Sequence, residues 1–305
     1  MNSNITKSEW RVNYVNSDDL LVFLAVVEEG SITRAAMRLG YVPSNVTARI
    51  RQLEAALHTT LFVRHSRGMT LAPPGHMLRP YAAKMRHVLN EAVLALEDSA
   101  TPQGALVVGA LETTAAVRLP KLLAAYHRQY PQVDLTLVTG PTYQLVEDVL
   151  QYKLEGAFVS GPVTHPDLHQ EAVFHEHLVL IAEIHAGDLQ TLQSKPLLVF
   201  RAGCSYRAKL EQWWASDGIL RPKIMEFGTL EAILGGVSAG LGVSLLPQSV
   251  VHQWETEEML RSYPVPQPYQ TTETVFIRHQ NAFITSAFRH FLEEIQHFTS
   301  NLHMG

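Results

Sequence analysis

Residues 17–57 contain three short stretches with helical periodicity, separated at Gly30 and near Gly40. In each stretch the apolar residues recur at intervals of three and four, which is typical of a helix with one buried face. Ser31 can cap the second helix, and glycine readily adopts the left-handed conformation that ends a helix. Because helices this short bury their apolar faces only against one another, the segment predicts a small helical domain.

The third stretch begins at Pro43, directly after a tight turn. Proline suits the first turn of a helix, where its missing N–H costs nothing. The buried side of this helix is formed by Val46, Ile50, Leu53 and Leu57. The polar residues at its start therefore face outward. Two helices joined by a glycine turn, the second with exposed polar residues at its start, predict a helix-turn-helix that reads base edges in the DNA major groove.

Positive charge gathers in the same part of a chain whose formal net charge is −5. Residues 31–90 contain nine Lys and Arg residues and a single acidic residue, whereas residues 101–305 contain 13 basic and 20 acidic residues. A basic head on an acidic body predicts a nucleic-acid-binding domain joined to a second part. Charge alone leaves a solvated basic surface as the alternative, and the helix-turn-helix pattern decides against it.

The segment LFVRHSRGMTLAPPG, residues 61–75, is typical of a β-hairpin that turns at Ser66, Arg67 and Gly68. A hairpin beside a helix-turn-helix predicts a wing, in which Arg64 and Arg67 contact the DNA backbone or the minor groove. The alternative is a surface hairpin without a DNA role.

Residues 74–98 have the periodicity of one long helix. Its apolar residues alternate at spacings of three and four, which is typical of a coiled-coil seam. The seam consists of Leu78, Tyr81, Met85, Val88, Ala92 and Ala95. A single helix cannot bury such a seam, so we expect a second copy of the chain to cover it. Packing of the seam on its own domain is the alternative.

A resemblance to the LysR-type transcriptional regulators covers residues 23–75 and rests on the segments GSITRAA, IRQLE, LFVR and LAPPG. It implies a winged helix-turn-helix in which the DNA-facing residues are Thr33, Arg34, Pro43, Ser44, Asn45, Thr47, Arg49 and Arg51, with Arg64 and Arg67 on the wing. Two residues depart from the family pattern. Val42 stands where the family usually has a capping serine, which implies a less well capped recognition helix, and Ala72 stands where it usually has threonine.

From residue 101 the pattern changes to short apolar strands that alternate with helical stretches. One such helix is predicted at residues 115–131. The predicted strands lie at 105–110, 133–140 and 156–161, and within 177–183, 196–203, 223–228 and 241–247. This alternation predicts α/β sheets with parallel strands.

The resemblance implies that this second part is an effector domain built like a two-lobed periplasmic binding protein. We therefore expect an α+β multidomain chain with an N-terminal extension (1–16), an all-α winged helix-turn-helix (17–75), a long linker helix for dimerisation (76–100) and an α/β effector domain (101–305). Lobe I takes residues 101–162 and 266–305, and lobe II takes residues 163–265. The crossovers near Pro162 and Pro264 are the expected hinge.

Ligands of open α/β sheets bind beyond the carboxyl ends of the strands. In this chain those ends are rich in hydroxyl groups and glycine, and several of them converge on one predicted cleft. Each hydroxyl taken alone is better explained as a helix N-cap, but the convergence favours a small-molecule site. The predicted effector-binding residues are Glu112, Thr113, Thr114, Thr142, Ser160, Arg201, Cys204, Ser205, Tyr206 and Thr229.

Charges of both signs lie in this predicted cleft. Helix N-termini and Arg201 or Arg207 favour an anion, whereas Glu112 favours a cation. Either the effector is amphoteric or amine-bearing, or Glu112 is neutralised within the protein by Arg201 or Arg207. The segments GALETTAAVRLP and FRAGCSYR are similar to the branch of LysR-type regulators linked to putrescine utilisation. That resemblance implies a polyamine or a related amine metabolite.

Other chemistries have little support. Cys204 is the only cysteine, which excludes an intramolecular disulfide and a cysteine-rich zinc site. No His-Glu-x-x-His segment is present, and His175 and His177 share a strand face without forming a site. Neither a metal nor another cofactor is therefore expected. The segment GGVSAGLG, residues 235–242, follows a helix instead of opening one, which favours close helix–sheet packing over a dinucleotide loop.

No apolar run approaches the roughly 20 residues of a membrane span, and the polar N-terminus lacks the apolar core of a signal peptide. A cytoplasmic protein without membrane contact is expected. The sequence predicts a DNA-binding transcriptional regulator, a homodimer or homotetramer, that binds an interrupted palindrome in double-stranded DNA. It is not predicted to be an enzyme, because no base–nucleophile pair is recognisable. The alternative is a two-lobed small-molecule-binding protein or an enzyme that lacks a DNA role.

Overall fold

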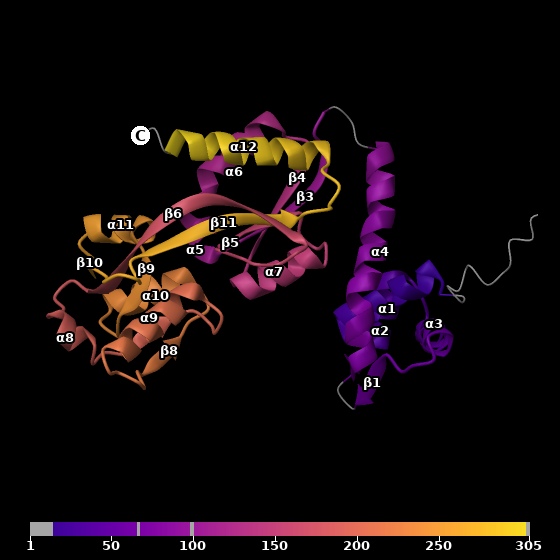
Figure 1. Cartoon of the computed structure of the whole chain (residues 1–305), viewed down its shortest axis with the longest axis horizontal. Coiled ribbons are helices and arrows are strands. Elements are labelled where there is room, and N and C mark those ends of the chain that lie inside the picture. Colours follow the sequence, from indigo (N-terminus) through magenta and orange to yellow (C-terminus); the bar gives the residue numbers. More distant parts are fainter. Residues whose placement is uncertain (1–14, 66–67, 98–100, 303–305) are drawn as a thin grey trace, which may run out of the picture. The chain divides into compact units, whose positions relative to one another are not determined.

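The computed structural model describes residues 15–65, 68–97 and 101–302. The chain folds into two compact units, residues 1–97 and 98–305 (Figure 1). Most of the predicted N-terminal extension lies outside the described residues, and so does Arg67 of the predicted wing.

The first unit begins with three helices, as the periodicity predicts: α1 (Ser17–Glu29), α2 (Ile32–Leu39) and α3 (Pro43–Ala56). The side chains of Asn16 and Ser31 accept main-chain N–H groups and cap α1 and α2. Gly30 and Gly40 end these two helices in the left-handed region. Val42 precedes α3 and provides no side-chain cap, as expected from its apolar side chain.

A hairpin and a long helix complete the first unit: β1 (Phe62–His65) pairs antiparallel with β2 (Gly68–Leu71), and α4 (Pro73–Glu97) follows. Gly68 has a φ of 135°, and a Cβ at this position would lie 2.5 Å from the carbonyl oxygen of Gly30. The Met69 N–H donates to that same oxygen at 3.0 Å. The hairpin therefore docks on the α1–α2 turn through a position that only glycine fills without strain.

The two halves of α4 have different surroundings within this unit. Ala82 and Ala83 are buried in the helical core, and Leu78 packs against it. Tyr81 is 73% exposed and Leu96 is 90% exposed. The predicted seam is thus divided, because Leu78 packs on its own domain and Met85 is half-buried, whereas Tyr81, Val88 and Ala92 are exposed. The side chain of Ala95 lies outside the described residues.

The second unit is built on a seven-stranded sheet with the order β10-β6-β11-β5-β3-β4, in which β9 also pairs with β6. Three strands are parallel, as predicted: β3 (Gly104–Ala110), β4 (Val133–Thr139) and β5 (Gly156–Ser160). The sheet as a whole is mixed, because the strands that pair antiparallel are β6 (Leu168–Glu183), β9 (Ser244–Pro247), β10 (Leu260–Tyr263) and β11 (Thr271–His279). A separate parallel pair is formed by β7 (Leu197–Val199) and β8 (Ile224–Glu226).

Helices cover both faces of the sheet in the first lobe. On one face lie α6 (Leu119–Gln129) and α12 (Ser286–Leu302), and on the other lies α7 (Thr142–Leu150) (Figure 1). The predicted helix 115–131 is instead two helices, with α5 (Glu112–Val117) ending before Arg118. Proline at position 120 explains the break, because it has no N–H to donate to the carbonyl four residues earlier and instead lies in the first turn of α6, where no such bond is needed.

The second lobe has its own core of buried side chains between residues 178 and 265. Around it lie α8 (Leu189–Leu192), α9 (Ser205–Ser216), α10 (Leu230–Ser238) and α11 (Gln248–Thr256). Among these, α9 contributes Trp213 and Trp214 to the core. Their rings are perpendicular, and the ring centroids lie 4.9 Å apart.

One strand passes through both lobes. Phe174 of β6 belongs to the core of the first lobe, and Leu178 belongs to the core of the second. The first half of β6 pairs with β11, and the second half pairs with β9 and β10. The boundary between the lobes therefore lies within β6 and not at residue 162. The predicted strand 177–183 is only the last part of β6, which has 16 residues.

Candidate functional site

The start of α3 presents the polar surface that the helix-turn-helix pattern predicts. Pro43, Ser44, Asn45 and Arg51 are exposed, while Val46 and Ile50 of the same helix are buried. Thr47 is half-buried, and its hydroxyl donates to the carbonyl oxygen of Pro43 at 2.9 Å within the same helix. The first turns of α3 thus offer short hydrogen-bonding groups outward.

Arg49 is held inside the first unit. Its Nη1 lies 2.8 Å from Oδ1 of Asp19, a carboxylate on α1 that is only 2% exposed. Its Nη2 lies 4.0 Å from Asp18, and the guanidinium sits 5.7 Å from the ring centre of Tyr41. Arg49 therefore fastens α3 to α1, a relationship across 30 residues that spacing within α3 does not reveal.

The arginines of α2 are tied to the acidic end of α1. Arg34, which is exposed like Thr33, donates to the carbonyl oxygen of Glu29. Arg38 lies 2.6 Å from Glu28, and Arg86 of α4 lies 2.8 Å from the other oxygen of the same carboxylate. Partial burial acts to raise the pKa of Glu28, but the hydrogen bonds from Arg86 and Arg38 hold it below its usual value.

Arg51 and Arg64 are exposed, and both line one hollow of about 330 Å³ between α3 and the hairpin. Within the described part of the chain, neither guanidinium has an ion pair or hydrogen bond. Their positive charge is therefore free to meet an external anion. This separates them from Arg34, Arg38 and Arg49, whose head groups have partners within the protein.

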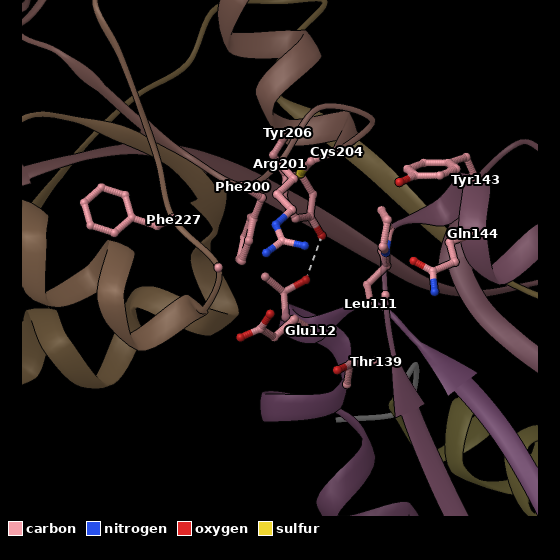
Figure 2. A pocket seen from close by; sticks show the side chains of 14 residues that line it. Leu111, Glu112, Thr139, Tyr143, Gln144, Phe200, Arg201, Cys204, Tyr206 and Phe227 are labelled. Atoms are coloured by element: carbon pink, nitrogen blue, oxygen red, sulfur yellow. Dashed lines mark hydrogen bonds between the residues drawn. The ribbon is translucent and has the colours of Figure 1, made fainter. Parts of the chain in front are cut away.

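A cavity of about 290 Å³ lies between the lobes of the second unit (Figure 2). Of the predicted effector-binding residues, those that line it are Glu112, Thr113, Arg201, Cys204 and Tyr206. They come from the start of α5 in one lobe and from the approach to α9 in the other. The cavity thus opens at the carboxyl ends of β3 and β7, where parallel strands bind ligands.

A hydrogen bond crosses this cavity. The hydroxyl oxygens of Thr113 and Tyr206 lie 3.0 Å apart, and both residues are buried (Figure 2). Burial raises the pKa of the Tyr206 phenol, so it remains a neutral hydroxyl. A second crossing contact is made by Glu112, whose Oε1 accepts the N–H of Leu230 at 2.8 Å and so caps α10.

The predicted neutralisation of Glu112 by Arg201 or Arg207 is not found. Arg207 instead pairs with Glu211 and Glu226, each at 2.9 Å. Arg201 is exposed and makes no ion pair or hydrogen bond among the described residues. The reason is geometric, since α9 turns Arg207 toward its own lobe. The cavity therefore holds the guanidinium of Arg201, which has no partner among the described residues, and the carboxylate of Glu112, of which one oxygen accepts a hydrogen bond.

The other predicted cleft residues do not line the cavity. Thr142 accepts the N–H of Ser160 at 3.2 Å, and Thr229 accepts the N–H of Ala232 at 3.2 Å as the cap of α10. Thr114 is buried in α5, and Ser205 begins α9. Thr229 thus has the capping role given as the alternative, whereas Thr142 caps no helix and its hydroxyl instead binds the end of β5.

Several lining residues escaped the sequence analysis: Thr139, Tyr143, Gln144, Phe200 and Phe227. Each lies within a few residues of a predicted strand end. At the start of α7 the helical turn directs Tyr143, and not Thr142, to the cavity, since successive helix residues point about 100° apart. The aromatic residues beside the predicted hydroxyl-bearing residues were the sequence signal that could have identified these lining positions.

Burial raises the pKa of the Cys204 thiol, which disfavours a reactive thiolate. This supports the expectation of a cleft-lining thiol. Among the residues that the structure describes, no group of three His, Cys, Asp or Glu side chains is arranged to hold a metal ion. In the same residues, no helix combines the length and the apolar character that crossing a bilayer requires.

Comparisons with known proteins agree with this two-part architecture. Residues 17–76 match the family model described as bacterial regulatory helix-turn-helix protein, lysR family, and residues 99–299 match the LysR substrate binding domain. Two Bacillus subtilis (strain 168) proteins are similar along most of their length. The uncharacterized HTH-type transcriptional regulator YusT is 51% identical over 279 residues, 92% of this chain and 95% of that protein. The HTH-type transcriptional regulator GltR is 50% identical over 288 residues, 93% of this chain and 97% of that protein.

A solved structure of full-length CbnR, complexed with its target DNA, shares the fold with a TM-score of 0.62. The two chains are 22% identical, and the match covers 93% of this chain and 99% of the CbnR chain. At this identity the likeness concerns the fold alone.

Proposed function

Because this chain belongs to the lysR family of bacterial helix-turn-helix regulators, we propose that it binds operator DNA through the first turns of α3 and the β1–β2 hairpin. It is a DNA-binding transcriptional regulator with a substrate-binding domain, and its relatives are named regulators and not enzymes. The observation that carries the proposal is the exposure of Ser44 and Asn45 at the start of α3 and of Arg51 about two turns further along the same helix.

The proposed DNA contacts fall into two groups. Ser44, Asn45 and Pro43 approach base edges, because short side chains at a helix start reach into the major groove. Arg51 and Arg64 contact phosphates, which their uncommitted guanidinium groups support. The predicted contacts of Thr33, Arg34, Thr47 and Arg67 remain part of the proposal by family resemblance.

Arg49 takes a different place in this proposal. Its ion pair with buried Asp19 supports a positioning role, in which Arg49 sets the angle of α3 on α1. A direct base contact by Arg49 requires release from Asp19. Such a release exposes or strands a buried carboxylate, which costs free energy.

We propose that a second copy of the chain covers the outward apolar side of α4. Val88, Leu89, Val93 and Leu96 are exposed in the single chain, and a helix in water does not keep such a stripe uncovered. A two-fold dimer then presents two copies of α3 to an interrupted palindrome. A tetramer is a pair of such dimers, and the place of action is the cytoplasm, where the DNA is.

The proposed effector binds in the cavity between the lobes and carries an amine. Glu112 has one carboxylate oxygen beyond the one that caps α10, and an ammonium group is its natural partner. Arg201 adds a requirement, because a second ammonium of a polyamine would meet a like charge. An amine metabolite that also carries a carboxylate satisfies both side chains, so it suits this cavity better than putrescine does.

Effector binding shifts the population of lobe arrangements in this proposal. The Thr113–Tyr206 hydrogen bond and the Glu112 cap of α10 both join the two lobes at the cavity. A ligand that prefers one arrangement of these groups changes its population by its difference in affinity. The change then reaches the DNA through the linker helix.

Gel mobility shift of the chain's own upstream DNA across salt concentrations tests the DNA role. We expect affinity to fall steeply as salt rises, by a slope of about −0.9 for each phosphate contacted. Ser44→Ala with Asn45→Ala should remove the preference for the upstream fragment over unrelated DNA. Equal binding of both fragments by the unaltered protein would refute sequence-specific recognition.

A further inference from the structure

A second cavity of about 350 Å³ lies in the second unit, at the opposite end of α5 from the effector cleft. Glu112 at the start of α5 lines the cleft, whereas Val117 at its end lines the second cavity. The cavity also receives Arg118, Lys121 and His252. Its size falls at the lower end of small-molecule sites, which span about 300–1,000 Å³.

The polar lining of this cavity is basic. Three of its side chains, those of Arg118, Lys121 and His252, bear or can acquire positive charge, and no acidic residue lines it. Within the described residues, the Lys121 ammonium and the His252 ring have no hydrogen bond or ion pair. Both side chains are exposed and free to accept an external partner.

Arg118 is fixed at the wall of the cavity by a buried acid. Its Nε and Nη2 donate to the two oxygens of Glu176 at 2.7 and 3.0 Å, and Glu176 is only 6% exposed. The Ser249 hydroxyl donates to Glu176 at 2.9 Å as well. The carboxylate is thus satisfied by its own partners. The Nη1 group of Arg118 has no described partner and retains its donors.

From these contacts we infer that the cavity is a second ligand site, which binds a small oxyanion such as a phosphate group between Lys121, His252 and the Nη1 of Arg118. Val117 and Phe298 form its apolar wall and leave room for the body of a phosphorylated metabolite. Gln248 and Ser249 also line it and begin α11, a helix without a side-chain cap, whose free N–H groups favour an anion.

The site spans the two lobes. Arg118 and Lys121 belong to the α5–α6 region of the first lobe, whereas Ser249 and His252 belong to α11 of the second. Because α11 packs directly on α5, an anion held between them tightens the contact opposite the effector cleft. The site is thus placed to adjust the lobe arrangement that the effector selects, and its existence does not depend on the identity of that effector.

Thermal melting and calorimetry of the full chain with inorganic phosphate test this site. Phosphate should raise the melting temperature saturably above that in potassium chloride of equal ionic strength. The double variant Lys121→Ala/His252→Ala should bind phosphate about tenfold more weakly or worse, because the charged hydrogen bond of Lys121 and the hydrogen bond from the His252 ring are both lost. Lys121→Arg should retain the effect, since it keeps the charge.

Two control variants distinguish this site from a general loss of surface charge and from phosphate binding in the effector cleft. Lys223→Ala removes an exposed lysine elsewhere, and Arg201→Ala removes the cation of the effector cleft. Both should respond to phosphate like the unaltered protein. No phosphate-dependent shift in the unaltered protein, or the same shift in the double variant, overturns the inference. Loss of the shift in Arg201→Ala would place the anion in the cleft and overturn it equally.

Discussion

The hydroxyl oxygen of Thr113 lies 3.0 Å from the phenol oxygen of Tyr206, so a single buried hydrogen bond joins α5 to α9 across the cleft. The two residues are 93 positions apart in the chain. The bond therefore exists only when both lobes are folded and brought together. Together with the Glu112 cap of α10, it holds the cleft in this arrangement.

Tyr206→Phe should lower the free energy of unfolding by about 1–2 kcal/mol, because the Thr113 hydroxyl is left buried without a partner. Urea unfolding of the full chain measures this change. Tyr143→Phe is the matched control, since Tyr143 lines the same cleft but its hydroxyl has no described partner. Equal stability of Tyr206→Phe and the unaltered protein would show that the bond is not maintained in solution.

Arg49→Ala should destabilise the free protein by about 2–3 kcal/mol, between the cost of a lost charged hydrogen bond and that of a stranded buried ion. Arg51→Ala should leave stability within about 0.5 kcal/mol, because its side chain is exposed. It should instead reduce the salt slope of DNA binding by about one. Urea unfolding and salt-dependent gel shifts distinguish the two arginines. The assignment fails if Arg49→Ala is as stable as Arg51→Ala.

The carboxylate of Glu28 should link stability to acid pH. Its pKa is lowered in the folded protein by Arg86 and Arg38. Its contribution is therefore fully present above the ordinary glutamate pKa of about 4.3 and is lost as pH falls through the lower folded value. Melting temperatures measured from neutral to acid pH should fall more steeply for the unaltered protein than for Glu28→Gln. Glu231→Gln, at an exposed position, serves as control, and parallel curves for Glu28→Gln and the unaltered protein would contradict the linkage.

Gly203→Ala should loosen the cleft. Gly203 has a φ of 95°, and a Cβ there would lie 2.7 Å from the ring of Tyr143 in the other lobe. Gly218→Ala is a fitting comparison, because its φ is 88° but nothing lies within 4 Å of its Cβ. Both variants carry the backbone strain, and only Gly203→Ala adds the clash. We expect a larger fall in melting temperature for Gly203→Ala, and equal falls would exclude a tight Gly203–Tyr143 contact.

The two charges of the cleft predict a preference between two ligands with a four-carbon chain. Calorimetric titration should show at least about tenfold tighter binding of 4-aminobutyrate than of putrescine, because Arg201 attracts a carboxylate and repels a second ammonium. Arg201→Ala should reduce the difference in affinity between 4-aminobutyrate and putrescine. Glu112→Gln should weaken both ligands while its amide oxygen still caps α10. Tighter binding of putrescine than of 4-aminobutyrate would contradict this preference and favour a polyamine as the effector.

Local signals were sufficient to predict the helices and the hairpin of the first unit. Ser31, Gly30 and Gly40 set helix boundaries through contacts within a few residues, and the structure has those boundaries. The role of Arg49 was not predictable in the same way. Its partner Asp19 lies on another helix, and the distance between them depends on how two helices pack.

In the second unit, the local pattern predicted most strands and the parallel direction of β3, β4 and β5, but it predicted neither β10 and β11 nor the antiparallel pairings. The antiparallel strand β11 follows a long excursion through the other lobe, so its neighbours are set by chain topology and not by its own residues. The cleft shows the same limit. Glu112 caps a helix that begins 118 residues later, a relationship that no spacing in the sequence encodes.

The continuity of β6 constrains how the lobes can move. Its backbone exchanges hydrogen-bonding partners from β11 to β9 and β10 near His177 and Leu178, without a loop between them. A rearrangement of the lobes must therefore twist this ribbon, since the peptide chain offers no slack for them to separate. Opening and closing of the lobes is thus a twist of β6 and not a hinge motion at a loop. Small backbone torsions along a few residues of this strand set the amplitude of the lobe movement.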